Sequence, residues 1–276
     1  MRLVSKAVIP LLLFFFFTDA YAKIQELDLG ISYLNKGLYN EAIEELRKAI
    51  EKEPENAEPY YHRGYAYHKI GDFTEAIRDY SKAISLDPLC AECYHNRGIV
   101  YYLKGDPELA ISDYNISLGI KPRNSEAYCN RGIAYYKKGK IDQAILNYDK
   151  AIQVNPYRFY AYYLRAITYD EKGEINQAIS DYKKSLEFNS QNAEACYFLG
   201  LAYQKKKDFN NAISSYTRAL SVNPNYLLAY IKRAEMYLKT KKYNKSWNDV
   251  HTVEALGFKV DQEMLEELKK TSGREE

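Results

Sequence analysis

Residues 125–158 read SEAYCNRGIAYYKKGKIDQAILNYDKAIQVNPYR, and this 34-residue pattern recurs along most of the chain. Proline marks the period, because the gaps between one set of prolines are all 34 residues or a multiple of 34. The set is Pro54, Pro88, Pro122, Pro156 and Pro224, with Ser190 in the one missing place. A fixed period of this length is typical of repeat architectures, in which each unit buries its apolar face against its neighbours.

Counting outward from these prolines divides residues 23–260 into seven units. They are 23–56, 57–90, 91–124, 125–158, 159–192, 193–226 and 227–260. Apolar residues make up 46% of the chain and charged residues 28%, which is the composition of a folded protein and not of a disordered one. A repeat array also removes the limit that a single hydrophobic core sets on a chain of 276 residues.

Local signals predict two helices joined by a turn within each unit. Glycine at position 15 suits the left-handed residue that ends a first helix, and proline at position 32 ends the second. Position 18 holds residues that we expect to cap the second helix: Asn40, Thr74, Asp142, Asn176, Asn210 and Asn244. In the third unit, Asp106-Pro107 reads instead as a cap followed by proline at the first helical position.

The unit resembles the tetratricopeptide repeat, which has aromatic residues at positions 4, 11 and 24, small residues at 8, 20 and 27, and proline at 32. The second unit matches with Tyr60, Gly64, Tyr67, Ala76, Tyr80, Ala83 and Pro88. Tyrosine stands at position 11 of all seven units. The resemblance covers residues 23–260 and implies an all-α fold, a right-handed superhelical α-solenoid of seven helix–turn–helix repeats.

A second recurrence joins positions 7 and 23. Four units pair arginine with aspartate there: Arg63 with Asp79, Arg97 with Asp113, Arg165 with Asp181 and Arg233 with Asp249. The fourth unit pairs Arg131 with Asn147, and units with leucine at position 7 lack the aspartate. We predict a ladder of partly buried ion pairs between helices; the alternative is that both are surface residues.

Both ends of the chain differ from the repeats. Gly257 suits a helix end and Asp261 a helix start, so residues 261–272 are predicted to form a C-terminal capping helix, with Trp247 packed there and residues 273–276 disordered. Residues 1–22 show a positive start, an apolar run and Ala20-Tyr21-Ala22, which together are typical of a signal peptide. We expect an exported protein, periplasmic or secreted; the alternative is anchoring by an uncleaved N-terminal segment.

The first helices of tetratricopeptide arrays line a concave groove that binds extended peptides or helices, mainly through positions 2, 5, 9, 12 and 13. On this chain the resemblance therefore implies a partner-binding set of Tyr61, Tyr65, His68, His95, Tyr102, Cys129, Tyr136, Tyr163 and Tyr197. Tyrosine, with 29 copies against 10 of phenylalanine, offers a large contact area and a hydroxyl. The alternative is that many of these rings pack between units.

Several partner classes are not expected. The chain without residues 1–22 has 37 basic and 36 acidic residues, so it lacks the excess of positive charge that nucleic-acid binding favours. Position 5 never holds lysine and position 9 never holds asparagine, so the chain lacks the carboxylate clamp by which one subtype of the family binds chaperone tails. No motif for a phosphate loop, a catalytic nucleophile or a metalloprotease is present, and we expect no enzyme activity and no cofactor.

The four cysteines leave three hypotheses open. Cys90 and Cys93 form a C-x-x-C motif without a second such pair, so a zinc site that adds His95 and Cys129 lacks the usual spacing. A local disulfide between Cys90 and Cys93 is favoured by an oxidising compartment. The third hypothesis is that the cysteines are unpaired, small core residues.

We interpret the chain as a non-catalytic scaffold of the cell envelope that binds a protein or peptide in the groove. The alternative is an accessory factor for assembly or secretion of pili or outer-membrane complexes. Such a factor would associate peripherally with a membrane through its partner.

Overall fold

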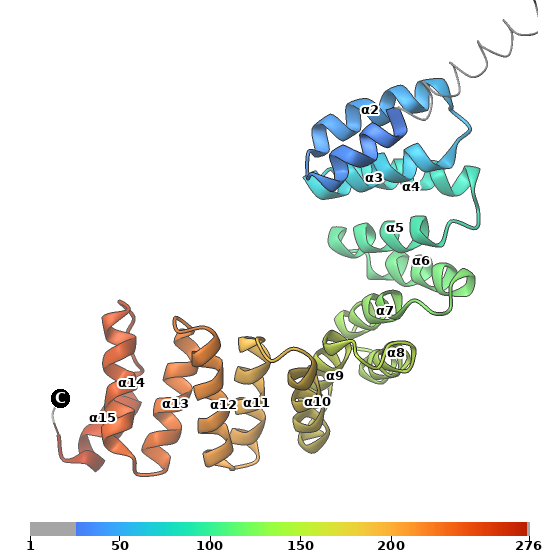
Figure 1. Cartoon of the computed structure of the whole chain (residues 1–276). Helices are drawn as coiled ribbons and strands as arrows, with labels where there is room; N and C mark the ends of the chain where they lie inside the picture. The colour runs from blue at the N-terminus through green and yellow to red at the C-terminus, as the bar shows by residue number, and fades with distance from the viewer. Residues whose placement is uncertain (1–25, 275–276) are drawn as a thin grey trace, which may run out of the picture. The chain divides into compact units, whose positions relative to one another are not determined.

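The computed structural model describes residues 26–274, and these residues form α-helices joined by short turns (Figure 1). Residues 26–35 are helical and are followed by fourteen further helices. These are α2 (Tyr39–Lys52), α3 (Ala57–Ile70), α4 (Phe73–Leu86), α5 (Ala91–Lys104), α6 (Pro107–Ile120), α7 (Ser125–Lys137), α8 (Ile141–Val154), α9 (Phe159–Lys172), α10 (Ile175–Phe188), α11 (Ala193–Lys205), α12 (Phe209–Val222), α13 (Leu227–Lys239), α14 (Tyr243–Ala255) and α15 (Gln262–Ser272).

The helices follow the 34-residue period closely. Each first helix from α3 to α13, called an A helix below, starts at repeat position 1, and each second helix from α2 to α14, called a B helix, starts at position 17. The predicted fold class is confirmed, because the chain is an all-helical solenoid of helix pairs. The handedness of its superhelix stays a prediction. So do the repeat boundaries predicted from the sequence, although the helix starts agree with them.

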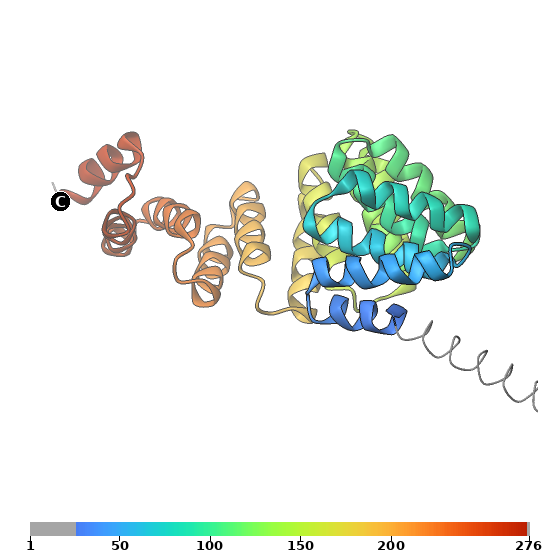
Figure 2. The same ribbon diagram turned by 90° about the horizontal axis from the view of Figure 1, so that it is seen from above.

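The chain divides into two units, whose described parts are residues 26–138 (unit 1) and 139–274 (unit 2). Within unit 1, each helix from α2 to α7 contacts the next one in the chain, and within unit 2 the same holds from α8 to α15, except that α14 packs more loosely on α15. Figures 1 and 2 show this side-by-side order inside each unit. A helices also contact one another directly within a unit: α3 with α5, α5 with α7, and α9 with α11.

Small residues and tyrosines make the contact between the two helices of a repeat. Tyrosine at position 24 is at most 1% exposed in five repeats, namely Tyr80, Tyr114, Tyr148, Tyr182 and Tyr216. A Cβ added to Gly64 would lie 3.0 Å from the Tyr80 ring, and one added to Gly200 would lie 2.6 Å from Cδ1 of Tyr216. Glycine at position 8 therefore leaves the space into which the tyrosine of the facing helix packs.

The prediction of helix caps at position 18 is wrong by two residues. The B helices start one residue earlier than position 18, so their N-cap residue stands at position 16, where Asp72 and Asp208 accept hydrogen bonds from backbone N–H groups. Asp106 is the N-cap of α6 with proline beside it, as predicted, but its side chain makes no capping hydrogen bond. Position 34, which the sequence analysis passed over, caps the A helices through Asn56, Asn124 and Asn192.

The turn after each A helix uses a left-handed residue at position 15. Glycine fills it in five repeats with φ between 70° and 94°, as predicted: Gly37, Gly71, Gly105, Gly139 and Gly173. The last two repeats place Lys207 and Lys241 there with φ of 61° and 58°. A residue with a side chain is strained in this conformation, so these two turns lower the stability of the fold relative to the glycine turns.

Proline at position 32 is not needed to end a B helix. α10 stops at Phe188, the same repeat position as α2, α4, α6, α8 and α12, although Ser190 replaces the proline of that repeat. Its C-cap, Asn189, has extended backbone angles close to those of Asn155 and Asn223 in neighbouring repeats. The end of α10 therefore does not depend on a proline two residues later.

The predicted ion-pair ladder is present. Arg97 donates from Nε and Nη2 to the two oxygens of Asp113, both at 2.8 Å, and the Arg63, Arg165 and Arg233 pairs have the same two-bond geometry. The four aspartate side chains are at most 8% exposed. Burial lowers the pKa of Arg97, but its hydrogen bond to Asp113 and the charge of that carboxylate raise it more, so the net pKa is raised.

Three of the four ladder arginines, Arg97, Arg165 and Arg233, also reach the preceding repeat, which the sequence did not indicate. The third nitrogen of Arg97 donates to Ser81 at 2.9 Å, and that of Arg233 donates to Thr217 at 3.0 Å. Arg165 pairs in the same way with Asp149. The guanidinium of Arg97 lies between the rings of position 4 and position 11, 5.6 Å and 5.8 Å from their centroids. The ladder therefore links two successive B helices through the A helix between them.

The C-terminal helix agrees with the prediction for residues 261–272. Asp261 caps α15 by accepting the N–H of Met264, and Gly257 has a positive φ at the end of the preceding helix. Trp247 is 4% exposed, belongs to the core cluster that α14 and α15 share, and donates to Ser272 Oγ at 3.2 Å. The predicted signal segment, residues 1–22, lies outside the described residues, and the predicted disordered tail is described only up to residue 274. Among residues 26–274, no helix has the length and apolar character needed to cross a bilayer.

Candidate partner-binding surface

Successive A helices are joined by side-chain contacts with a spacing of 35 residues. The Tyr61 hydroxyl accepts from the amide of Asn96 at 3.1 Å, and His95 Nε2 lies 2.9 Å from the amide nitrogen of Asn130. Position 5 of one repeat therefore contacts position 6 of the next. The surface formed by positions 2, 5, 6, 9, 12 and 13 of the A helices within one unit is called the A-helix face below.

The same spacing joins position 12 to position 13 of the next repeat. The ammonium group of Lys137 lies 4.9 Å from the ring centroid of Tyr102, and Lys205 donates to Asp170 at 2.6 Å. Neighbouring A helices are therefore in side-chain contact at two places, between positions 5 and 6 and between positions 12 and 13. The A-helix face is continuous from one helix to the next.

The nine predicted partner-binding residues fall into two groups. Five are half-buried and present part of their side chain: Tyr61, Tyr65, His68, Tyr102 and Tyr136. Four are buried, at 8% exposure or less: His95, Cys129, Tyr163 and Tyr197. All four buried residues stand at position 5, and two of them contact position 6 of the next repeat: His95 with Asn130 and Tyr163 with Phe198. Partner binding by the nine stays a prediction, and only the first group offers surface in this structure.

Position 6 is the part of the face that the sequence analysis missed. It holds His62, Asn96 and Asn130 in unit 1, all half-buried. Positions 2, 6, 9 and 13 follow the spacing i, i+4, i+7 and i+11, which places residues on one side of a helix. This helical spacing was the signal that could have found position 6.

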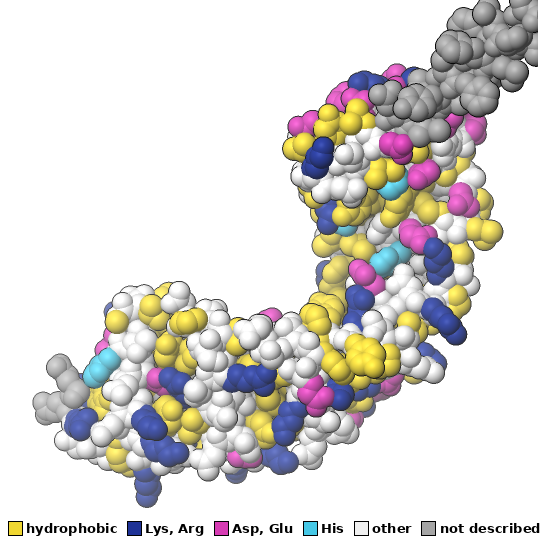
Figure 3. Space-filling model, viewed as in Figure 1, with side chains coloured by type: hydrophobic (Ala, Val, Ile, Leu, Met, Phe, Trp, Pro, Cys, Tyr) yellow, Lys and Arg dark blue, Asp and Glu magenta, His cyan; other side chains and the backbone are white. Residues whose placement is uncertain are grey.

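Two pockets lie on the A-helix face of unit 1. The α5–α7 pocket is lined by Ile99, Tyr102, Tyr114, Glu126, Asn130 and Ile133. The α3–α5 pocket lies near the starts of these helices and is lined by Asn56, Ala57, Glu58, Tyr61, His62, Asp87, Cys90, Glu92 and Cys93. In unit 1, Figure 3 shows histidine and acidic side chains set among hydrophobic ones. Pockets with apolar walls and a few polar groups are typical of sites that hold a side chain of a ligand.

Burial changes the ionisation of groups on this face. It lowers the pKa of His62 and His68, although Glu58 opposes the effect at His62, and it raises the pKa of Tyr61 and Tyr80. Both histidines are therefore neutral near pH 7. The Tyr80 hydroxyl and His68 Nδ1 are buried and make no hydrogen bond within the described part of the chain.

On the A-helix face of unit 2, aromatic rings pack against one another. The Phe198 ring stacks on Tyr182 with centroids 6.3 Å apart and planes 10° from parallel, and it also contacts Tyr163 and Tyr197. Tyr160, 39% exposed, stacks on Tyr163 at its edge. Here position 6 closes over position 5 with a ring and not with an amide, so the chain's own aromatic residues fill the space between α9 and α11.

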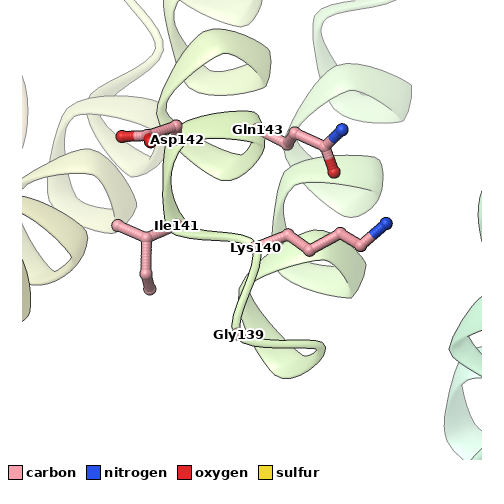
Figure 4. A pocket seen from close by; sticks show the side chains of 5 residues that line it. All are labelled: Gly139, Lys140, Ile141, Asp142 and Gln143. Carbon is pink, nitrogen blue, oxygen red and sulfur yellow. The ribbon is translucent and has the colours of Figure 1, made fainter.

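A further pocket lies at the turn before α8 and is formed by consecutive residues only (Figure 4). Its lining runs from Gly139 to Gln143, and the Asp142 side chain points to the opposite side from those of Lys140 and Gln143. The equivalent turn before α14, residues 241–245, forms a similar pocket. These pockets are features of the turn and bring no groups together for chemistry.

The cysteines are of two kinds in this structure. Cys90 and Cys93 are joined by a disulfide at the start of α5, whereas Cys129 and Cys196 are buried and lie outside this disulfide. Within residues 26–274, no three His, Cys, Asp or Glu side chains lie close enough together to hold a metal ion. The nitrogen of His95 that faces Asn130 is 2.9 Å from its amide, so this histidine serves the contact between α5 and α7.

Comparisons with known proteins agree with this geometry. A family model described as TPR repeat matches residues 30–71, 66–105, 100–139 and 168–207, and two models described as tetratricopeptide repeat match 125–157, 193–226 and 147–180. Together they cover residues 30–226 without a gap. No curated protein matches the sequence.

Solved structures extend the comparison. The structure of MamA is 30% identical with a TM-score of 0.56 and covers 58% of this chain and 94% of its own. YrrB, described as a TPR protein with an unusual peptide-binding site, is 24% identical with a TM-score of 0.56 over 67% of this chain and 95% of its own. The pilF protein of Pseudomonas aeruginosa is 21% identical with a TM-score of 0.68 over 80% of this chain and 99% of its own. At their levels of identity, YrrB and pilF support the fold alone.

Proposed function

Because the chain belongs to the tetratricopeptide repeat family, we propose that it is a non-catalytic scaffold that binds an extended peptide or protein segment on the A-helix face of unit 1. The observation that carries the proposal is the α5–α7 pocket. Ile99 and Ile133 give it apolar walls from two neighbouring helices, and Glu126 and Asn130 add a carboxylate and an amide at the same place.

These groups suit a peptide better than a small polar ligand. An apolar side chain of the peptide fits between the two isoleucines, and the Tyr102 ring extends the apolar wall. Glu126 accepts hydrogen bonds, whereas the amide of Asn130 both donates and accepts, so the pair can satisfy the N–H and C=O groups of an extended backbone. Half-buried tyrosines along the face add contact area at a low cost in conformational entropy.

The proposal includes the place where the protein works. The pattern of residues 1–22 supports export, so we place the scaffold in the cell envelope or outside the cell. N-terminal sequencing of the protein from the envelope fraction tests this, with Lys23 expected as the first residue and an intact Met1 contradicting cleavage. An accessory role in assembling pili or outer-membrane complexes remains the alternative, since the likeness to pilF establishes only the fold.

The experiment is a selection of peptides from a random display library on the full chain, followed by fluorescence anisotropy with the selected peptides. A variant with Tyr65, Tyr102 and Tyr136 changed to Ala should weaken binding at least about tenfold, since each ring contributes contact area at the centre of the face. A matched control changes Leu89 and Tyr157 to Ala, which are 73% and 75% exposed and stand at position 33, outside the A-helix face.

Two results would contradict the proposal. One is equal binding by the triple variant and the native chain, which would move the binding surface to another part of the protein. The other is an equal loss in both variants, which would indicate a nonspecific apolar effect. Far-UV circular dichroism checks that all three proteins keep the same helix content.

A further inference from the structure

Cys90 occupies position 34, where three other repeats carry a helix-capping asparagine, and Cys93 is the third residue of the helix that follows. Position 34 is the N-cap of the A helix, and in the fourth and sixth repeats Asn124 and Asn192 cap the helix by accepting the N–H of the third helical residue. That third residue is Ala127 or Ala195 in those repeats. The repeat fold therefore forms α5-type helices without any cysteine at these two places.

The disulfide preserves the capping role while adding a reactive bond. Cys90 is the N-cap of α5, and its sulfur accepts the N–H of Cys93 at 3.1 Å, as the asparagines do elsewhere. Both cysteines line the α3–α5 pocket, so the bond is reached from the A-helix face. The two sulfurs differ in access, because Cys90 is half-buried whereas Cys93 is 0% exposed and packs against Tyr60 and Ala83.

We propose that Cys90 and Cys93 form a thiol–disulfide exchange site whose substrate is a dithiol with cationic or neutral surroundings. The access of Cys90 decides which sulfur is attacked. The pocket around Cys90 is lined by three carboxylates, Glu58, Asp87 and Glu92, and by the ring of Tyr61. Of these carboxylates, Glu92 forms an ion pair with Lys121. This excess of negative charge repels anionic thiols and favours cationic ones.

The exchange balances without any further reagent. A substrate thiol loses its proton, and the thiolate attacks Sγ of Cys90; the disulfide breaks, and its electron pair goes to Sγ of Cys93, which takes up a proton. The second thiolate of the substrate then attacks the substrate sulfur of the mixed disulfide and displaces Cys90. The substrate is oxidised by two electrons to a disulfide, and the cysteine pair is reduced to two thiols.

The N-terminus of α5 offsets part of the effect of the three carboxylates on the displaced Cys90 thiolate. The N–H of Cys93 that the Cys90 sulfur accepts in the disulfide remains available, and the positive end of the helix stabilises an anion at the cap. The site does not depend on the peptide binding proposed above, because a small thiol can reach Cys90 through the pocket without occupying the rest of the face.

The test uses the full chain and two small disulfides of opposite charge. The protein is reduced with dithiothreitol without denaturant and freed of reductant. It is then mixed with cationic cystamine or anionic glutathione disulfide at neutral pH, and the cysteines are mapped by alkylation and mass spectrometry. We expect reduction and reoxidation of the pair without loss of helix content. Cys90 should react with cystamine at least about tenfold faster than with glutathione disulfide, and faster than the buried Cys129 and Cys196.

Two variants make the result decisive. Cys93→Ala should hold a stable mixed disulfide on Cys90, since the second sulfur is missing. Cys90→Asn/Cys93→Ala reproduces the capping residues of the fourth and sixth repeats, so it should keep the melting temperature within a few degrees and lack the exchange. Should Cys93→Ala not fold, Cys93→Ser provides the same trap with a polar replacement.

A pair that is reduced only when the chain unfolds would overturn the proposal, and so would a folded Cys93 variant that traps nothing on Cys90. Equal rates with the two disulfides would overturn the assigned substrate class. A failure here leaves the peptide-binding proposal intact, because the tyrosine variants of that test retain both cysteines.

Discussion

The Arg97–Asp113 ion pair gives a direct test of how the ladder acts on stability. We predict that Asp113→Ser alone and Arg97→Leu alone are both strongly destabilising, whereas the double variant is much closer to the native chain. The choice of residues comes from the protein itself, since the sixth repeat carries Leu199 and Ser215 at these positions. There the leucine is 7% exposed, and the serine hydroxyl donates to the carbonyl of Asn211 at 2.8 Å.

The magnitudes follow from burial. The Asp113 side chain is 5% exposed and that of Arg97 is 17% exposed, so removing one partner leaves the other charge largely without water or a counter-charge. Losing one partner of a buried pair costs about 3–5 kcal/mol, whereas replacing both by groups of suitable shape is close to neutral. Arg97 also loses its hydrogen bond to Ser81, so we expect the double variant to cost about 1–2 kcal/mol. On these values the coupling energy should be at least about 4 kcal/mol.

Urea unfolding followed by far-UV circular dichroism measures the four free energies of this cycle. The m-values must agree among the four proteins, because repeat arrays can lose two-state behaviour. Amide hydrogen exchange in α5 and α6 then shows whether the loss is local to this repeat. Single variants that cost less than about 1 kcal/mol each and add up to the double variant would refute the reasoning. The pair would then be a solvated surface contact.

Three further predictions concern positions outside the ladder. Gly200→Ala should lower the free energy of unfolding by about 1–3 kcal/mol, because the added Cβ would lie against a buried tyrosine ring. Gly119→Ala should raise it by about 0.5–1 kcal/mol, because Gly119 is an exposed helical residue with open space around it. The urea midpoints of the two variants measure both effects. Lys207→Gly should stabilise the chain by about 1 kcal/mol by removing a strained left-handed lysine, and a lower melting temperature would contradict this. Burial lowers the pKa of His62 and His68 in the folded state, so stability is complete above the unfolded pKa of about 6.5 and falls as the pH drops below it; the His62→Gln/His68→Gln variant should lose less between pH 7 and pH 5.5.

The sequence predicted the fold well because the period repeats each signal several times. Helix starts at positions 1 and 17, the left-handed glycines and the paired arginines all recur, so one ambiguous repeat does not decide the outcome. The cap prediction failed because polar residues occur both at position 18 and at position 16. Asp72 and Asp208 show that the side chain two residues earlier accepts the hydrogen bond. A local propensity cannot distinguish these two registers, whereas the packing of the helix pair can.

The binding surface was harder to predict than the fold, because position 5 depends on a contact between repeats. His95 is a polar residue on an A helix, which favours exposure, yet Asn130 of the next repeat packs over it at 2.9 Å. The contact cannot be predicted from one 34-residue unit alone, because it joins two repeats. It becomes visible when residues 35 apart are compared, since position 5 of one repeat then pairs with position 6 of the next.

The residues at position 6 also give the A-helix faces of the two units different binding properties. In unit 1 it holds His62, Asn96 and Asn130, whose polar groups can exchange their hydrogen bonds for those of a ligand at little cost. In unit 2 the ring of Phe198 stacks on Tyr182, and opening that contact would expose apolar area with no polar group to compensate. A peptide should therefore bind to the face of unit 1 more favourably than to that of unit 2, because it can form hydrogen bonds there. Asn130→Phe places the phenylalanine of the sixth repeat at the same position of the fourth and should close the α5–α7 pocket. Loss of peptide binding with unchanged helix content would support this assignment, and unchanged affinity would place the peptide elsewhere on the face.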